Sequence, residues 1–191
     1  MSKKKVFLRH LPHIIVTLVV LLALLAVAFI WGSTEIKRQL PIKYEAEVEK
    51  YSAEYGLDKY FVYAVICAES GFDKDAQSSA GAKGLMQIMP ETAKWLKNKY
   101  KLDIDAENLF DAETNIHIGC QYLKYLSGRF NDDKDLILAA YNGGEGNVGK
   151  WLNNSLYSSD GKTLTKIPFK ETANYVERVS TYYDLYKKIY S

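Results

Sequence analysis

Cysteine and histidine are scarce in this chain of 191 residues. The two cysteines, Cys67 and Cys120, form no CxxC pair. We interpret them as small buried hydrophobic residues, and a disulfide between them remains the alternative. The three histidines are scattered and form no ligand pair. We therefore expect no metal and no cofactor, and a metal-dependent hydrolase is disfavoured.

A charge excess of one sign is also lacking. The chain has 25 basic and 23 acidic residues, which gives a formal net charge of +2. This excess is too small to imply a polyelectrolyte partner, so we expect no nucleic acid. The length suits one hydrophobic core but falls short of two ordinary domains plus a membrane segment. One folded domain is the expectation.

One uncharged apolar run, Ile14–Trp31, lies near the N-terminus. With a helical rise of about 1.5 Å per residue, it is just long enough to cross a bilayer. Lys3, Lys4, Lys5 and Arg9 precede it. Basic residues on this side favour a cytoplasmic N-terminus and export of the remainder.

This pattern predicts a cytoplasmic N-terminus at 1–13, a single transmembrane anchor at 14–31, a connector at 32–41 and a catalytic domain at 42–191. The domain would lie outside the cytoplasm, held at the cell membrane. A cleaved signal peptide is the alternative, because Ala26-Val27-Ala28 resembles a cleavage site. The apolar run exceeds the ~7–15 residues usual in a signal peptide, which favours the anchor. Both interpretations export the domain.

Strand-like alternation is absent between Ile42 and Ser191, whereas helix signals recur. The domain is therefore predicted to be mainly α-helical. Helices are expected at 42–55, 58–69, 90–99, 112–129, 134–141 and 168–190, with a surface loop at 153–163. Pro90 and Pro168 suit a first helical position. The second helix is apolar almost all round, which predicts a central, buried position.

Glu69 directly follows the apolar residues Val65–Ala68 at the end of that second helix. A carboxylate in such a place is unfavourable unless it is solvated, hydrogen-bonded or functional. From this feature alone, a solvated Glu69 and a functional one are equally good interpretations. The segments that follow it along the chain favour the functional one.

Four blocks of sequence occur in a characteristic order after the apolar helix. They are Glu69-Ser70-x-Phe72 with Ser78, Gly81-Ala82-x-Gly84-Leu85-Met86-Gln87-Ile88-Met89-Pro90-x-Thr92-Ala93, Ala140-Tyr141-Asn142-x-Gly144, and Glu171-Thr172-x-x-Tyr175-Val176. Together they resemble the catalytic domain of soluble lytic transglycosylases, over about residues 45–190. The resemblance implies a lysozyme-like α-helical fold related to goose-type lysozyme.

The resemblance also implies an activity and a site. The activity would be cleavage of the β-1,4 bond between N-acetylmuramic acid and N-acetylglucosamine in peptidoglycan glycan strands, leaving a 1,6-anhydromuramic acid end. Glu69 would be the catalytic acid. The substrate-binding residues would be Ser78, Gln87, Met89, Tyr141, Asn142 and Tyr175. Met86 is left open between a core position and the groove.

A convincing second catalytic carboxylate is lacking. Ordinary glycosidases place two carboxyl groups ~5–5.5 Å or ~6.5–9.5 Å apart. Asp73 and Asp75 are near Glu69 in sequence, but their loop is bounded by Gly and Ser, so we expect them to be solvated. One acid suffices where the substrate supplies its own nucleophile. The alternatives are a hydrolytic muramidase of the same fold and a non-catalytic wall-binding module.

Overall fold

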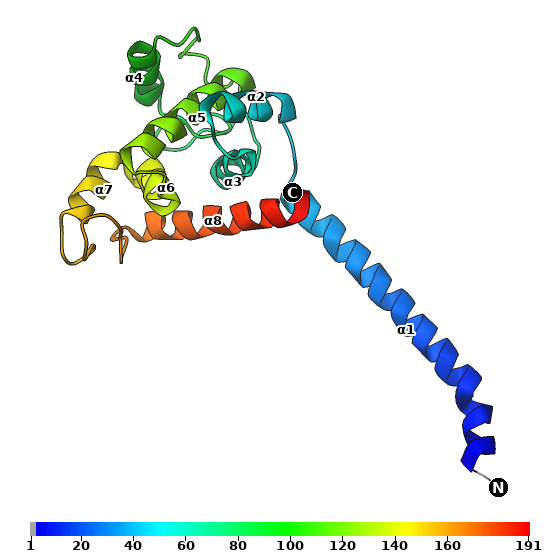
Figure 1. Cartoon of the computed structure of the whole chain (residues 1–191). Coiled ribbons are helices and arrows are strands. Elements are labelled where there is room, and N and C mark those ends of the chain that lie inside the picture. Colours follow the sequence, from blue (N-terminus) through cyan, green and yellow to red (C-terminus); the bar gives the residue numbers. More distant parts are fainter. Residues whose placement is uncertain (1–2) are drawn as a thin grey trace. The chain divides into compact units, whose positions relative to one another are not determined.

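The computed structural model describes the backbone of residues 3–191 and the side chains of residues 15–28, 31, 32, 35 and 37–191. The chain divides into two compact units, Met1–Pro41 and Ile42–Ser191. The first unit contains one helix, α1 (Lys3–Gln39), drawn in blue in Figure 1. This helix continues past Trp31, so most of the segment expected as a connector is helical.

Among the residues that the structure describes, no helix is both long enough and apolar enough to cross a membrane. The segment expected as an anchor, 14–31, lies partly outside the described side chains, since positions 14, 29 and 30 are not among them. The side chains of the expected cytoplasmic segment 1–13 all lie outside them.

The second unit is helical, which confirms the prediction of a mainly α-helical domain. Its helices are α2 (Glu45–Tyr55), α3 (Lys59–Ser70), α4 (Pro90–Tyr100), α5 (Ala112–Arg129), α6 (Lys134–Gly143), α7 (Glu145–Leu152) and α8 (Lys170–Tyr190). Within residues 3–191 the only β pairing is two isolated bridges, which join Lys83 to Gln77 and to Ile88. These bridges shape the loop between α3 and α4.

Local signals explain most helix boundaries. Asp58 caps α3 by accepting a hydrogen bond from the backbone N–H of Tyr60, and Pro90 occupies the first turn of α4. The prediction for Pro168 was wrong, because α8 begins only at Lys170, after Phe169 in an extended conformation. The helix α7 was not predicted. It starts directly after Gly144, whose φ of 87° allows the sharp turn from α6.

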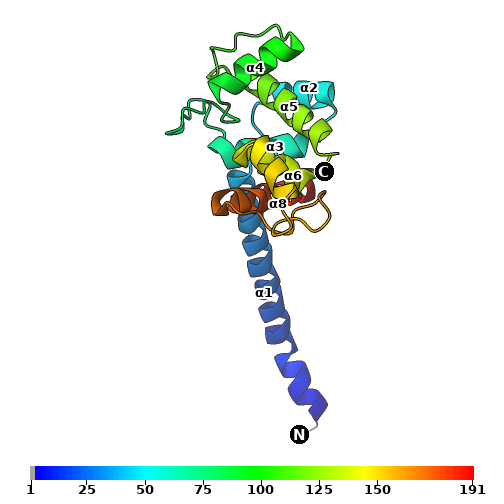
Figure 2. The same ribbon diagram turned by 90° about the vertical axis from the view of Figure 1, so that its left-hand side faces the viewer.

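The helix α3 lies at the centre of this unit, as its apolar sequence predicts. It contacts α2 and α8, and Figures 1 and 2 both draw it between those two helices. Its residues Phe61–Ile66 are all buried. The core continues into α5, α6 and α8 through Leu123, Leu138 and Val179, each 0% exposed. Because neighbouring helices pack around α3, they fix the positions of the residues at its C-terminal end.

Candidate active site

Glu69 lies in the last turn of α3, which ends at Ser70 and is closed by Gly71 in the left-handed conformation (φ 59°). The side chain is neither fully buried nor fully exposed. The C-terminus of a helix carries partial negative charge, so it disfavours an ionised carboxylate there. Within the described part of the chain, none of the ion pairs includes Glu69. No salt bridge to another described residue therefore neutralises its carboxyl group.

Three influences set the pKa of Glu69: burial, the Tyr175 hydroxyl and the Arg178 guanidinium. Burial raises the pKa of Glu69 to about 7, while the nearby Tyr175 hydroxyl and the Arg178 guanidinium act in the opposite direction and lower it. A carboxyl group with this pKa exchanges its proton readily near neutral pH. It can therefore donate a proton in one step and accept one in the next.

Two tyrosines from different helices flank this carboxyl group. Tyr141, in the last turns of α6, donates a hydrogen bond from its hydroxyl to the Met86 carbonyl at 2.8 Å. Tyr175, in α8, is 2% exposed, and its hydroxyl has no hydrogen-bond partner among the described residues. Burial first, and then the charge of Glu69, raise the pKa of both phenols. Both hydroxyls therefore remain protonated donors beside Glu69.

The unpaired Tyr175 hydroxyl is notable because buried polar groups are rarely left without a partner. It lies near Glu69 without meeting the geometry of a hydrogen bond. A small rearrangement toward the Glu69 carboxyl group would satisfy it. The arrangement thus leaves one buried donor available next to the carboxyl group.

The loop between α3 and α4 carries three of the expected site residues. Gln87 has a left-handed backbone (φ 48°), and its side-chain amide donates to the carbonyls of Ala76 at 3.1 Å and Gly84 at 2.9 Å. The Ser78 hydroxyl accepts a hydrogen bond from the Ala82 N–H at 3.0 Å. These two side chains brace the loop from within, since their bonds close its turns.

The remaining expected residues lie at exposed helix ends. Met89 precedes α4 and is 36% exposed, and Asn142 is exposed in the last turn of α6. Tyr141 and Tyr175 are the titratable members of the six expected binding residues, and the charge of Glu69 contributes to raising the pKa of both. The other four occupy the α3–α4 loop and the end of α6.

Met86 belongs to the core, which decides the question that the sequence left open. It is 0% exposed, and its side chain lies against Gly119 of α5 so closely that a Cβ there would stand 2.2 Å from the Met86 sulfur. A larger residue at that position would force the Met86 side chain to move. The Met86 backbone still contacts the expected site, because its carbonyl accepts a hydrogen bond from the Tyr141 hydroxyl.

Asn115 of α5 supports this loop and was missed by the sequence reasoning. It is 0% exposed and makes three hydrogen bonds: its carbonyl accepts from the Met86 N–H at 2.8 Å, and its amide donates to the carbonyls of Lys83 at 2.9 Å and Leu109 at 2.8 Å. A Cβ on Gly84 would meet this amide at 2.3 Å. Its role depends on the loop that packs against α5, so the sequence offered no local signal for it.

Arg178 was also missed. It lies one turn after Tyr175 on α8, with its guanidinium carbon 5.7 Å from the centre of the Tyr175 ring. Its charge lowers the pKa of Glu69. The spacing of three residues from Tyr175 places both on one side of the helix, and that spacing was the sequence signal.

No second carboxylate joins Glu69 from the loop that follows it. Asp73 and Asp75 are exposed, as expected. Asp75 pairs with Lys74 at 2.8 Å, and Asp73 accepts a hydrogen bond from the Asp75 N–H at 3.0 Å. Within the described residues, no disulfide joins Cys67 to Cys120. The ionisable groups around this centre are thus the Glu69 carboxyl group, the phenols of Tyr141 and Tyr175, and the exposed guanidinium of Arg178.

Comparison with known proteins identifies chains of similar sequence and fold. The soluble lytic murein transglycosylase of Escherichia coli (strain K12) is 34% identical over 155 residues, covering 80% of this chain and 24% of that protein. The crystal structure of the 70 kDa soluble lytic transglycosylase from Escherichia coli superposes with a TM-score of 0.72 at 31% identity, covering 80% of this chain and 25% of that one. This chain thus spans about a quarter of the length of these relatives.

Some relatives are named as membrane-bound. The membrane-bound lytic murein transglycosylase F of Desulfosudis oleivorans is 33% identical over 182 residues, covering 80% of this chain and 38% of that protein. The similarity to the solved structure establishes the lysozyme-like fold of the second unit. The model of the transglycosylase SLT domain matches residues 47–163, more than half of the chain, and the chain therefore belongs to the transglycosylase SLT domain family.

Proposed function

We propose that this protein is a peptidoglycan lytic transglycosylase with Glu69 as its one catalytic acid and base. The observation that supports this most directly is the pKa of Glu69, which burial raises to about 7 while no salt bridge neutralises the group within the described residues. Family membership supports the substrate, because the relatives are named murein transglycosylases. The substrate is the glycan strand of peptidoglycan.

In the first step, protonated Glu69 donates its proton to the oxygen that joins N-acetylmuramic acid to N-acetylglucosamine. The C1–O bond breaks, and the 2-acetamido group of the muramic acid stabilises the positive charge that develops at C1. The N-acetylglucosamine side of the strand leaves with the proton. Glu69 is left as a carboxylate, and the proximity of Arg178 favours this charged form.

In the second step, the C6 hydroxyl of the muramic acid attacks C1, and Glu69 removes the hydroxyl proton. A 1,6-anhydro ring forms, and Glu69 is protonated again without consumption of water. Positioned acid/base catalysis supplies about 10²–10⁴ in rate. Binding and the participation of the substrate provide the remainder.

The groove that holds the strand is assigned to residues around this centre. They are Ser78, Gln87, Met89, Tyr141, Asn142 and Tyr175. The buried Tyr175 hydroxyl, which lacks a partner among the described residues, suits a hydrogen bond to a polar atom of the sugar. Tyr141 is held in place by the hydrogen bond from its hydroxyl to the Met86 carbonyl.

We place the catalytic domain outside the cytoplasm, anchored through the apolar segment 14–31. The support is the uncharged run itself, the basic residues before it and the existence of membrane-bound relatives. A cell-wall substrate requires export, so the location and the activity agree.

The experiment that tests this function is digestion of purified peptidoglycan by the full chain, with mass spectrometry of the released fragments. We expect 1,6-anhydromuramic acid ends from the wild-type protein and no release from Glu69→Gln. Reducing ends would instead identify a hydrolytic muramidase. Binding to peptidoglycan with no cleavage by the wild-type protein would identify a wall-binding module. Cleavage by Glu69→Gln at the wild-type rate would refute the role of Glu69.

A further inference from the structure

A row of aromatic rings leads from the site to the surface of α4. The ring of Tyr141 lies 5.2 Å from that of Tyr122 on α5, and Tyr122 stacks with Tyr125 at 6.4 Å and an interplanar angle of 11°. Tyr125 meets Trp95 of α4 edge to face at 4.8 Å. These centroid distances fall within the range of interacting aromatic pairs. Neighbouring rings therefore contact one another all the way from Tyr141 at the site to Trp95 on α4.

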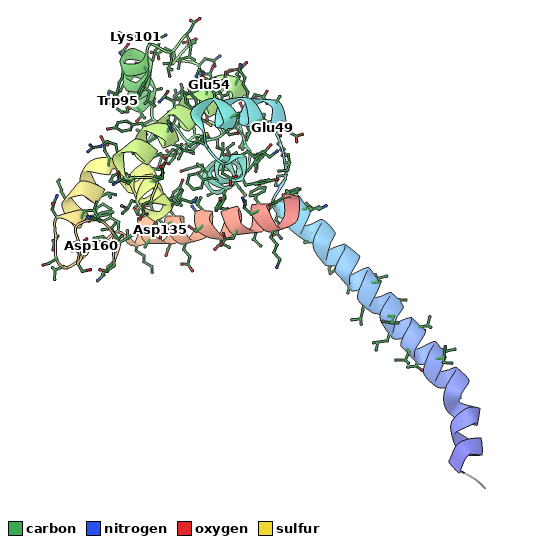
Figure 3. The ribbon with its side chains drawn as sticks, viewed as in Figure 1. Glu49, Glu54, Trp95, Lys101, Asp135 and Asp160 are labelled. Carbon is green, nitrogen blue, oxygen red and sulfur yellow. The ribbon has the colours of Figure 1, made fainter. Side chains whose placement is uncertain are left out.

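The outer end of this row is exposed. Trp95 and Tyr100 are each 38% exposed, and Figure 3 shows Trp95 projecting from α4. A large aromatic residue that served only the core would be buried, as Tyr63 and Tyr186 are. The exposed sides of these two rings are therefore available for contact.

One ammonium group lies over these outer rings. The Lys99 nitrogen stands 4.8 Å from the ring centre of Trp95, 4.3 Å from that of Tyr125 and 5.5 Å from that of Tyr100. Cation–π attraction holds the group in place, although the side chain is exposed. Its three N–H bonds can donate to hydroxyl or amide oxygens of a ligand that contacts the rings.

The position of Tyr125 is fixed by polar contacts on the α7 side. Its hydroxyl donates to the Glu145 carboxylate at 2.7 Å, and the same carboxylate pairs with Arg129 at 3.5 Å. A ring that is anchored at its hydroxyl loses little further entropy when a ligand stacks on its face. The ring of Tyr125 is thus already ordered before a ligand binds.

We propose that Trp95, Lys99, Tyr100 and Tyr125, here called the α4–α5 aromatic patch, form an additional binding surface for the glycan strand beyond the catalytic centre. This inference rests on the proposed function. Continuity through Tyr122 and Tyr141 identifies the occupant as the same strand that Glu69 cleaves. Sugar rings present apolar faces for stacking and acetamido oxygens for the Lys99 ammonium. The patch lets the enzyme select strands that are long enough to reach it.

The test uses binding in place of cleavage, in the full chain carrying Glu69→Gln. Calorimetry with β-1,4-linked N-acetylglucosamine trimer and hexamer measures the preference for the longer oligomer. We expect the hexamer to bind more tightly than the trimer, and Trp95→Ala to reduce this preference about tenfold. Trp95→Phe retains a ring face and should restore most of it. Far-ultraviolet circular dichroism checks that each variant folds.

A matched charge variant completes the experiment. Lys99→Gln should weaken hexamer binding, whereas Lys124→Gln removes the same charge from an exposed position on α5 that makes no ring contact among those described. The inference is overturned if trimer and hexamer bind alike, if neither binds, or if Trp95→Ala leaves the preference unchanged. If the binding experiment contradicts this inference, the wild-type protein should still cleave peptidoglycan through Glu69. If the proposed function itself is wrong, the digestion experiment shows no anhydro ends.

Discussion

At the residue scale, Glu69 is governed by the balance between burial, which favours its neutral form, and the polar groups beside it, which favour the charged form. Burial is the larger influence, and the pKa settles at about 7. The unfolded chain offers no such environment, so the ordinary value of 4.5 applies there. This difference links the proposed chemistry to the stability of the fold.

The linkage predicts that Glu69 destabilises the protein at alkaline pH. Because its pKa is higher in the folded state, the free energy of unfolding falls as pH rises from about 4.5 to about 7 and stays low above that range. Glu69→Gln mimics the neutral form. We expect it to stabilise the fold by up to about 3 kcal/mol at about pH 8 and by little at about pH 4. Denaturant unfolding at both values measures the change.

The control for this measurement is the same change at an exposed position, Glu177→Gln on α8. A gain in stability at alkaline pH that appears in both variants would assign the effect to net charge rather than to the burial of Glu69.

Arg178 supplies a second prediction. Its guanidinium lowers the pKa of Glu69, so Arg178→Gln should raise that pKa. The first step needs the protonated acid, and cleavage by the wild-type protein should decline as pH rises through about 7. In Arg178→Gln this decline should move to higher pH. The shift is modest because Arg178 is exposed and screened by salt.

The pH profile of peptidoglycan release measures this shift, with Lys188→Gln as the control that removes an equal charge from an exposed position on the same helix. A profile for Arg178→Gln that coincides with that of the control would exclude an electrostatic action of Arg178 on Glu69.

At the scale of elements, the site depends on how α5 holds the α3–α4 loop. Asn115 bonds the Met86 N–H and the carbonyls of Lys83 and Leu109. Asn115→Ala leaves the Met86 N–H and the Leu109 carbonyl without this partner, while the Lys83 carbonyl keeps the Ile88 N–H, and we expect a loss of about 3 kcal/mol in the free energy of unfolding. The loop also carries the carbonyl that positions Tyr141, so kcat should fall as well.

Thermal and denaturant unfolding measure the first effect, and cleavage of peptidoglycan measures the second. Thr114→Ala, the neighbouring change on the same helix, serves as the control, since its hydroxyl makes none of these loop contacts. Wild-type stability in Asn115→Ala would contradict the supporting role of Asn115.

The elements differ in how well their sequence specifies them. The helices α3 to α6 were predicted closely, because each has a local start signal, such as Asp58 before α3 or Pro90 in α4. The helix α7 was missed because glycine at 143, 144, 146 and 149 weakens any helical pattern, and its Trp151 is buried only through tertiary packing. Predictions from local pattern fail where packing decides the structure.

The candidate site also divides into residues that local sequence marks and residues that tertiary packing brings in. Glu69 could be singled out from the apolar helix before it, because the unfavourable position of a carboxylate is a local feature. The roles of Asn115 and Arg178 depend on segments that are distant in sequence, namely the loop at 83–88 and the end of α3. A single sequence carries no measure of such contacts, so the partners of these two residues became visible only in the folded chain.

At the scale of the whole molecule, the chain combines an apolar N-terminal segment with a domain for which we propose an insoluble polymer as the substrate. We predict that the apolar segment 14–31 anchors the protein. In fractionated cells the full chain should remain with the membranes after alkaline carbonate extraction. A variant that lacks residues 1–31 and carries a cleavable export signal should be released in soluble form, because the hydrophobic contribution of the segment is lost.

The mass of the mature protein distinguishes the anchor from a cleaved leader. An intact N-terminus in the membrane fraction supports the anchor, whereas loss of the residues up to Ala28 identifies a signal peptide. Replacement of Leu22 by arginine, near the middle of the apolar run, should weaken membrane retention because a charge at the bilayer centre is unfavourable by about 2.5–3.5 kcal/mol. Retention of that variant in carbonate-washed membranes at the wild-type level would rule out 14–31 as the anchoring segment.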